Sequence, residues 1–227
     1  MKVQLFGYGK MGKIHGKYLD EQNIPFTVYD PKVKMGHADK FGDTVAEGIT
    51  HAIIASPYDK HWENYQQVRE WYGDIPILIE KPVFIDKEHL PEIKNVFAGM
   101  CERFNENVVA LKEKIEANNE QVVCVHYTNV YENDCSNKHL DLEIHGLDLA
   151  AFFKSTGYIS SVHKTTCPGR TLRQVHVATK TAHNDRKDYC VYLLEKVPST
   201  ILLEQQAFFR GDTCDATKAH RELLERL

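Results

Sequence analysis

Three glycines follow a short apolar run almost at the start of the chain, in the stretch LFGYGKMGKIH. The apolar residues 3–7 predict a buried strand that enters a turn, and apolar side chains at helical spacing predict a helix over about residues 11–21. Gly7, Gly9 and Gly12 therefore lie in the connection between a strand and the helix that follows it. Few arrangements place three glycines so close together at such a junction.

Strands and helices alternate through the first hundred residues. Apolar runs rich in Val and Ile predict further strands, and an intervening amphipathic stretch that ends at Gly73 predicts a helix. This pattern is typical of βαβ units and of a parallel sheet covered on both faces. The predicted strands are IPFTVYDP, THAIIASP, IPILIEKP and KNVFAGM, and the predicted helix is KHWENYQQVREWYG.

The pattern changes near residue 105. A helical stretch, NENVVALKEKIEANN, precedes several strands that have few helices between them, which favours a mainly antiparallel sheet. We expect an α/β protein in two domains: a doubly wound Rossmann domain over 1–104 and a smaller α+β domain with an open antiparallel sheet over 105–227. The strands expected in the second domain are EQVVCVHYTNVY, ISSVHKTT, RQVHVATKTA, DYCVYLLE and TILLEQQAFF, with helices near 139–153 and in ATKAHRELLERL.

Composition excludes several classes of protein. A net charge of -4 over 227 residues gives no electrostatic reason to expect nucleic acid as a partner. No apolar run approaches the roughly 20 residues that span a bilayer, and no signal peptide precedes the first strand, so we expect a cytoplasmic protein with no membrane partner. The six cysteines form no C-x-x-C pair and the histidines no H-E-x-x-H, so we expect free thiols and no metal.

The glycine stretch also satisfies the context that a dinucleotide-binding loop requires. It follows a predicted strand and opens a predicted helix, and Asp30 comes at the end of the next strand. Gly7 would permit the tight turn, Gly9 would admit the pyrophosphate, and Gly12 would let the helix pack closely. Asp30 would accept hydrogen bonds from the adenosine ribose. The alternative is a simple structural turn between strand and helix.

Asp30 also bears on the choice of cofactor. Its carboxylate would repel a 2′-phosphate, which favours NAD over NADP. Lys32 and Lys34 follow closely, and either lysine could neutralise that phosphate. We therefore expect NAD and keep NADP as an alternative.

Four further stretches accompany the glycine loop: ASPYDKH, IEKPVF, GMCERFN and DLEIH. Together with GYGKMGKIH, they resemble the Gfo/Idh/MocA family, which includes glucose–fructose oxidoreductase and inositol dehydrogenases. The resemblance runs from residue 1 to about residue 153. It implies a Rossmann domain followed by an α/β domain with an open, mainly antiparallel sheet.

The resemblance also implies roles for individual residues. Lys81 would lie near the nicotinamide and the reacting hydroxyl, His145 would serve as acid/base, and Asp141 would support it. A histidine near neutrality can move the hydroxyl proton in either direction, and an ammonium can stabilise oxyanion character. The residues expected at the cofactor are Gly7, Tyr8, Gly9, Lys10, Met11, Gly12, Asp30, Ser56, Pro57, His61, Glu80 and Lys81.

Each catalytic candidate has a plainer interpretation. Lys81 could be a surface lysine at a strand end, and His145 could be a helix histidine paired only with Asp141. Asp148 fits a structural role better than a catalytic one.

The chain also departs from the family pattern. It is shorter than most members, Tyr58 stands where the family often has asparagine, and Glu143 replaces a small residue. These changes put substrate specificity in doubt. We expect an NAD(P)-dependent dehydrogenase or reductase that acts on a secondary hydroxyl or ketone of a sugar, polyol or related small molecule, in a homo-oligomer. The alternative is a non-catalytic dinucleotide-sensing or regulatory protein on the same scaffold.

Overall fold

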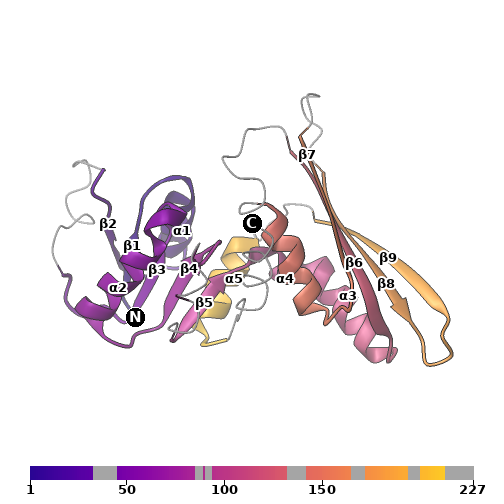
Figure 1. Cartoon of the computed structure of the whole chain (residues 1–227). Coiled ribbons are helices and arrows are strands. Elements are labelled where there is room, and N and C mark those ends of the chain that lie inside the picture. The colour runs from indigo at the N-terminus through magenta and orange to yellow at the C-terminus, as the bar shows by residue number, and fades with distance from the viewer. Residues whose placement is uncertain are drawn as a thin grey trace. The chain divides into compact units, whose positions relative to one another are not determined.

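The computed structural model describes residues 1–32, 45–84, 89, 94–131, 142–164, 172–193 and 200–212 of the 227-residue chain (Figure 1). These residues form two compact units. The described residues of Met1–Gly99 and Gln205–Asp215 make the first, and those of Met100–Glu204 make the second. The expected boundary lay at Phe104; in the structure the 3-10 helix η3 (Cys101–Phe104) packs with the second unit.

The first unit is built on a five-stranded parallel sheet. Its strands are β1 (Val3–Phe6), β2 (Phe26–Tyr29), β3 (His51–Ile54), β4 (Ile77–Glu80) and β5 (Val96–Gly99), and their order is β2-β1-β3-β4-β5. The helices are α1 (Lys10–Glu21) and α2 (His61–Tyr72), with the 3-10 turn η1 (Tyr58–Lys60) before α2. Because the strand order reverses at β1, right-handed crossovers place α1 and α2 on opposite faces. The doubly wound parallel sheet expected from the sequence is confirmed.

Burial explains why these strands are so apolar. Leu5, Ile53, Leu78 and Ile79 have no exposed surface, as expected for strands that are covered on both sides. The strand order reverses between β1 and β3, and the carboxyl ends of these two strands mark the switch point of the sheet. In open α/β sheets this is the place where ligands bind.

The segment TILLEQQAFF, expected to be a strand, is instead the helix α5 (Thr200–Phe209). Its buried positions are 204, 205, 207 and 208, which is the spacing of one helical face. Two of those positions, Glu204 and Gln205, are polar, so the pattern of apolar residues did not indicate the helix. Phe208 packs within the first unit, with its ring centroid 5.7 Å from that of Phe97 and 5.5 Å from that of His51.

The second unit contains a four-stranded mixed sheet in the order β7-β6-β8-β9. The strands are β6 (Gln121–Tyr131), β7 (Tyr158–Lys164), β8 (Leu172–Lys180) and β9 (Arg186–Tyr192). Pairs β6–β8 and β8–β9 are antiparallel, as expected. The β6–β7 pair is parallel, because the helix α4 (Ile144–Phe152) lies between those strands in the chain and serves as their crossover.

One face of this sheet carries the core of the second unit. Figure 1 shows α4 and α3 (Glu106–Ala117) on that side of the sheet. The buried cluster joins both helices to the central strands, and includes Val108, Leu111, Ile115, Val125, Tyr127, Leu149, Phe153, Val175 and Val177. On the opposite face, Ile159 and Tyr192 are about half exposed, at 52% and 53%.

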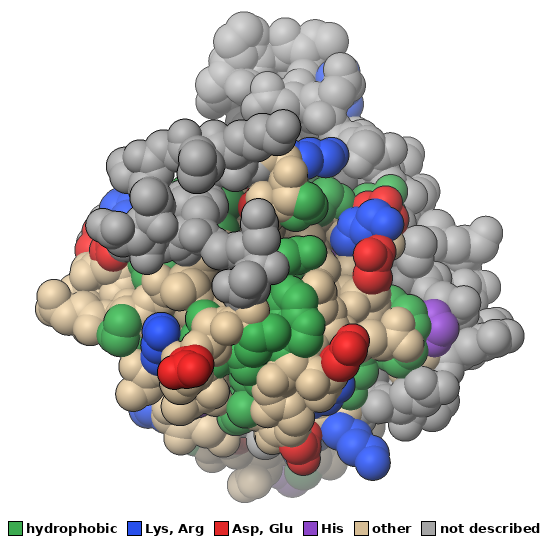
Figure 2. All heavy atoms as spheres, turned by 90° about the vertical axis from the view of Figure 1, so that its left-hand side faces the viewer, with side chains coloured by type: hydrophobic (Ala, Val, Ile, Leu, Met, Phe, Trp, Pro, Cys, Tyr) green, Lys and Arg blue, Asp and Glu red, His purple; other side chains and the backbone are tan. Residues whose placement is uncertain are grey.

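Two further findings concern the helices and the surface of the described chain. Along the described parts of the chain, no helix combines the length and the apolar character that crossing a membrane would require. Figure 2 shows one side of the first unit, where apolar side chains gather among lysines, arginines and acidic residues. Charges of both signs are interspersed on this side.

Candidate functional site

The glycine loop lies at the reversal point of the parallel sheet. Gly7 follows β1 with φ +84°, a conformation that favours glycine, and its N–H donates to the Tyr29 carbonyl over 2.9 Å. A Cβ at Gly7 would lie 2.6 Å from the backbone N and Cα of Ser56. The loop after β1 therefore packs directly on the backbone that follows β3.

Gly12 and Gly9 are glycines for different reasons. A Cβ at Gly12 would lie 2.1 Å from the Gly7 carbonyl oxygen, so close packing of α1 on the loop requires glycine there. A Cβ at Gly9 would meet no atom of the described chain within 4 Å. Packing among the described residues therefore does not explain Gly9, and they leave the space at its Cα open.

The N-terminus of α1 faces this loop without a side-chain cap. Gly9 is the N-cap residue and has no side chain to accept a hydrogen bond from the first turn, which begins with Lys10 and Met11. The first N–H groups of a helix have no partner inside the helix, and they attract anions. Open space at Gly9 and an uncapped helix N-terminus together fit a phosphate group.

Asp30 completes this arrangement at the end of β2. Its Oδ2 accepts a hydrogen bond from the Tyr8 N–H over 2.7 Å, and its Oδ1 accepts one from the Lys32 N–H over 2.8 Å. Two backbone amides thus orient the carboxylate beside the glycine loop, and its oxygens have further lone pairs for a ribose hydroxyl. Lys34 lies outside the described residues. The residues at the carboxyl ends of β1 and β2 fit a dinucleotide.

His61 connects the loops that follow β3 and β4. Its Nε2 lies 2.9 Å from the Ser56 carbonyl oxygen, and its Nδ1 lies 2.8 Å from that of Pro82 and 3.2 Å from that of Val83. Burial lowers the pKa of His61, although these carbonyls oppose the shift. Ser56 in turn donates from Oγ to Asn64 over 2.7 Å. His61 thus positions both loops; its direct contact with a cofactor stays a prediction.

Glu80 belongs to a buried chain of hydrogen bonds that the sequence did not reveal. Gln22 donates to Gln205, Gln205 donates to Nδ1 of His15 over 3.1 Å, and Nε2 of His15 lies 2.9 Å from Glu80 Oε1. Burial alone would raise the pKa of Glu80, but the hydrogen bond and charge of His15, assisted by Lys81, hold it below its ordinary value. Glu80 therefore ties β4 to α1.

Lys81 follows β4 directly and is partly exposed, and the Lys81–Pro82 peptide is cis. Pro57 precedes η1 after the neighbouring strand β3. Both residues thus extend from carboxyl ends of adjacent strands in the first unit. The role of Lys81 near a reacting hydroxyl stays a prediction.

His145 lies near the start of α4 in the second unit, where it is 7% exposed. Donor atoms of Cys101, Glu102 and His145 all lie within 4.8 Å of one another. The expected supporting residue, Asp141, falls outside the described residues. Lys81 belongs to the first unit and His145 to the second.

Asp148, three residues after His145, has a clear structural partner. Its carboxylate receives two hydrogen bonds from the Arg103 guanidinium, one of them over 2.9 Å from Nε. Burial raises the pKa of Asp148, while Arg103 opposes that shift. This pair attaches η3 to α4 and agrees with a structural role for Asp148.

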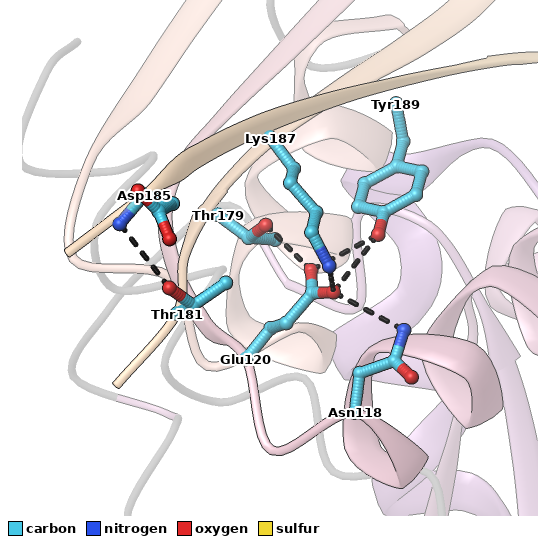
Figure 3. Close-up of polar contacts among 7 residues, drawn as sticks. All are labelled: Asn118, Glu120, Thr179, Thr181, Asp185, Lys187 and Tyr189. Carbon is cyan, nitrogen blue, oxygen red and sulfur yellow. Dashed lines mark hydrogen bonds and ion pairs between the residues drawn. The ribbon is translucent and has the colours of Figure 1, made fainter. Parts of the chain in front are cut away.

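A second polar cluster surrounds Glu120, the residue just before β6 (Figure 3). Its carboxylate accepts hydrogen bonds from Thr179 Oγ1 over 2.6 Å, Lys187 Nζ over 2.7 Å and Tyr189 Oη over 3.0 Å, and Asn118 adds a fourth over 3.1 Å. Burial alone would raise the pKa of Glu120, but these donors lower it to about 2. The cluster joins the start of β6 to β8 and β9.

Comparison with known proteins adds information on the fold. No family model matches the sequence, and no curated protein sequence matches it significantly. Solved structures do match. The chain resembles myo-inositol dehydrogenase from Lactobacillus casei in complex with NAD(H) and myo-inositol, with a TM-score of 0.74 at 15% identity over 99% of this chain and 91% of that one.

Two other structures match equally well. The WlbA (WbpB) dehydrogenase from Thermus thermophilus, in complex with NAD and UDP-GlcNAcA, has a TM-score of 0.74 at 17% identity over 99% of this chain and 94% of that one. UDP-N-acetylglucosamine 3-dehydrogenase GnnA from Acidithiobacillus ferrooxidans has 0.74 at 14% identity, over 100% and 95%. The chain has the fold of these dehydrogenases. The Gfo/Idh/MocA fold expected from the sequence motifs is confirmed.

Proposed function

We propose that this protein is an NAD(P)-dependent oxidoreductase that acts on a secondary hydroxyl or ketone of a sugar, polyol or related small molecule. One observation carries the proposal: the glycine loop, the uncapped N-terminus of α1 and Asp30 lie together at the reversal point of a parallel sheet. Solved structures of the same fold are dehydrogenases of inositol and of nucleotide sugars, which supports a carbohydrate-like substrate.

The proposed cofactor site uses the residues of the first unit. The first-turn amides of α1 would bind the pyrophosphate, and the open space at Gly9 would admit it. The carboxylate of Asp30 would accept hydrogen bonds from the ribose and disfavour a 2′-phosphate, so we propose NAD as the preferred cofactor. When bound, the nicotinamide supplies the hydride acceptor for alcohol oxidation and the donor for the reverse reaction.

Proton transfer would fall to the chain's own side chains. Oxidation of a secondary alcohol releases a hydride from carbon and a proton from oxygen, and we propose that His145 takes that proton. In the reverse direction the same imidazole would return the proton to the carbonyl oxygen. The ammonium of Lys81 would stabilise the negative charge that develops on the oxygen.

Titration of the purified protein with NADH and with NADPH, followed by nicotinamide fluorescence, tests the cofactor step first. We expect micromolar binding of NADH and weaker binding of NADPH. If neither NADH nor NADPH binds, the proposed function is wrong. Binding without turnover on any sugar or polyol would favour the dinucleotide-sensing alternative instead.

Two substitutions test the chemical step. We expect Lys81→Ala and His145→Ala each to lower turnover by about a hundredfold or more while NADH still binds, because acid/base and oxyanion contributions have that size. Turnover close to that of the wild type in both variants would show that neither residue is catalytic.

We also propose that the protein forms a homo-oligomer through the outer face of the second unit's sheet. Ile159 on β7 and Tyr192 on β9 are half exposed on this face, which the helices α3 and α4 leave uncovered. Sedimentation equilibrium of the wild type and of Tyr192→Lys tests this, and a monomeric wild type would contradict it.

A further inference from the structure

Three side chains of the types that ligate metals meet in the second unit, two from adjacent residues and one from a separate helix. A thiol sulfur, a carboxylate oxygen and an imidazole nitrogen, from Cys101, Glu102 and His145, all lie within 4.8 Å of one another. Cys101 and Glu102 open η3, and His145 lies in the first turn of α4. The sequence led us to expect no metal, because its cysteines form no C-x-x-C pair and its histidines form no H-E-x-x-H.

The two elements that carry these donors are fixed to each other. Arg103, next to Glu102, forms a two-point hydrogen bond with Asp148, which is 1% exposed and lies on the same face of α4 as His145. The Arg103 guanidinium also lies over the Phe152 ring, 5.6 Å from its centroid. The relative position of the three donors is therefore set by packing, as a metal site requires.

Glu102 has the support that metal-bound carboxylates usually have. It is 1% exposed, and Arg173 on β8 donates a hydrogen bond to its Oε1. A carboxylate offers about four lone-pair positions on its two oxygens, so the same group can accept from a guanidinium and ligate a metal ion. Such outer contacts orient ligands and raise metal affinity.

We propose that Cys101, Glu102 and His145 form a zinc site. Thiolate, imidazole and carboxylate are the ligands that Zn²⁺ takes, and three protein ligands with one open position is a common zinc arrangement. Bonds of about 2.0–2.3 Å place tetrahedral donors about 3.3–3.8 Å apart, so side-chain rotations of about 1 Å would close the observed group around the ion. Cys101 is only partly buried, which gives the ion a route from solvent.

Zinc binding has a consequence for activity. Binding deprotonates the thiol of Cys101 and occupies a ring nitrogen of His145, which could then no longer exchange a proton with substrate. Zinc should therefore inhibit the enzyme. This inhibition rests on the proposed function, whereas metal binding itself does not.

Cobalt titration of the metal-stripped protein, without cofactor or substrate, tests the site directly. We expect one Co²⁺ per chain, with intense visible bands of a tetrahedral site and a near-ultraviolet thiolate-to-cobalt charge-transfer band, both displaced by Zn²⁺. Cys101→Ser should abolish the charge-transfer band, and His145→Asn should weaken metal affinity by about tenfold or more. Circular dichroism checks that both variants fold.

Cys190→Ser serves as the matched control, because Cys190 lies on β9 with its sulfur 3.5 Å from Nε2 of His176. We expect this variant to bind cobalt as the wild type does. The proposal is overturned if the wild type binds no cobalt at micromolar concentration, or if the charge-transfer band survives in Cys101→Ser. If metal binds as expected but no dehydrogenase activity is found, the zinc site stands and the proposed function fails.

Discussion

Gly9 and Gly12 stand three residues apart in one loop, yet the structure predicts opposite consequences for the same substitution. A Cβ at Gly9 meets no atom of the described residues within 4 Å, whereas a Cβ at Gly12 lies 2.1 Å from the Gly7 carbonyl oxygen. Ordinary carbon–oxygen contacts are about 3.3 Å or longer, so a side chain at Gly12 overlaps the backbone by more than about 1 Å. That overlap can be relieved only by moving α1 away from the loop.

The magnitudes follow from these distances. Gly12→Ser should lower the free energy of unfolding by about 3 kcal/mol, the upper range for overpacked sites. Gly9→Ser should change it by less than about 0.5 kcal/mol, because Gly9 is the N-cap of α1 and serine is at least as good there. Gly9→Ser should nevertheless weaken NADH binding by about tenfold or more, or about 1.4 kcal/mol, because its side chain enters the space proposed for the pyrophosphate.

Both quantities can be measured in the unit that carries the loop. The chain has two tryptophans, Trp62 and Trp71, and both lie on α2 in the first unit. Urea unfolding followed by tryptophan fluorescence therefore reports on that unit, and nicotinamide fluorescence reports NADH affinity. Equal losses of stability in the two variants would refute the steric argument. Unchanged NADH affinity in Gly9→Ser would refute the assignment of the open space at Gly9 to the pyrophosphate.

Three other predictions follow from named contacts. Asp30→Asn keeps an acceptor but removes the charge, so the ratio of NADPH to NADH affinity should rise by about tenfold; an unchanged ratio would show that Asp30 does not select the cofactor. His15→Ala leaves the buried carboxylate of Glu80 without its histidine, so urea unfolding should show a loss of about 3 kcal/mol, and a loss below about 1 kcal/mol would contradict this. The pKa of Glu120 is lowered to about 2, so the stability that its ionised form contributes is present above about pH 4.5 and is lost as the pH falls towards 2. Hydrogen exchange in β8 and β9 measures the stability of the second unit as a function of pH, and Glu120→Gln should flatten this dependence between about pH 4.5 and 2. The same pH dependence in the variant and the wild type would contradict the role of the Glu120 cluster.

Local patterns determined much of the fold. Short apolar runs marked the strands of the parallel sheet, and the glycine spacing with Asp30 marked the loop that follows β1, because these signals extend over a few residues and depend on backbone geometry. The same kind of reasoning failed for α5. Its buried face contains Glu204 and Gln205, and only packing shows why polar residues occupy that face.

Side-chain partners depended on the tertiary structure. Nothing in the sequence links His15 to Glu80 and Gln205, Glu120 to Lys187, or Cys101 and Glu102 to His145. Each group joins segments whose separation along the chain has no fixed period, so no spacing rule can find it. The sequence determined the strands of the parallel sheet and the glycine turn that follows β1. The packing of those elements decided which polar groups meet, because burial obliges each charged side chain to find a partner that only the folded chain brings within reach.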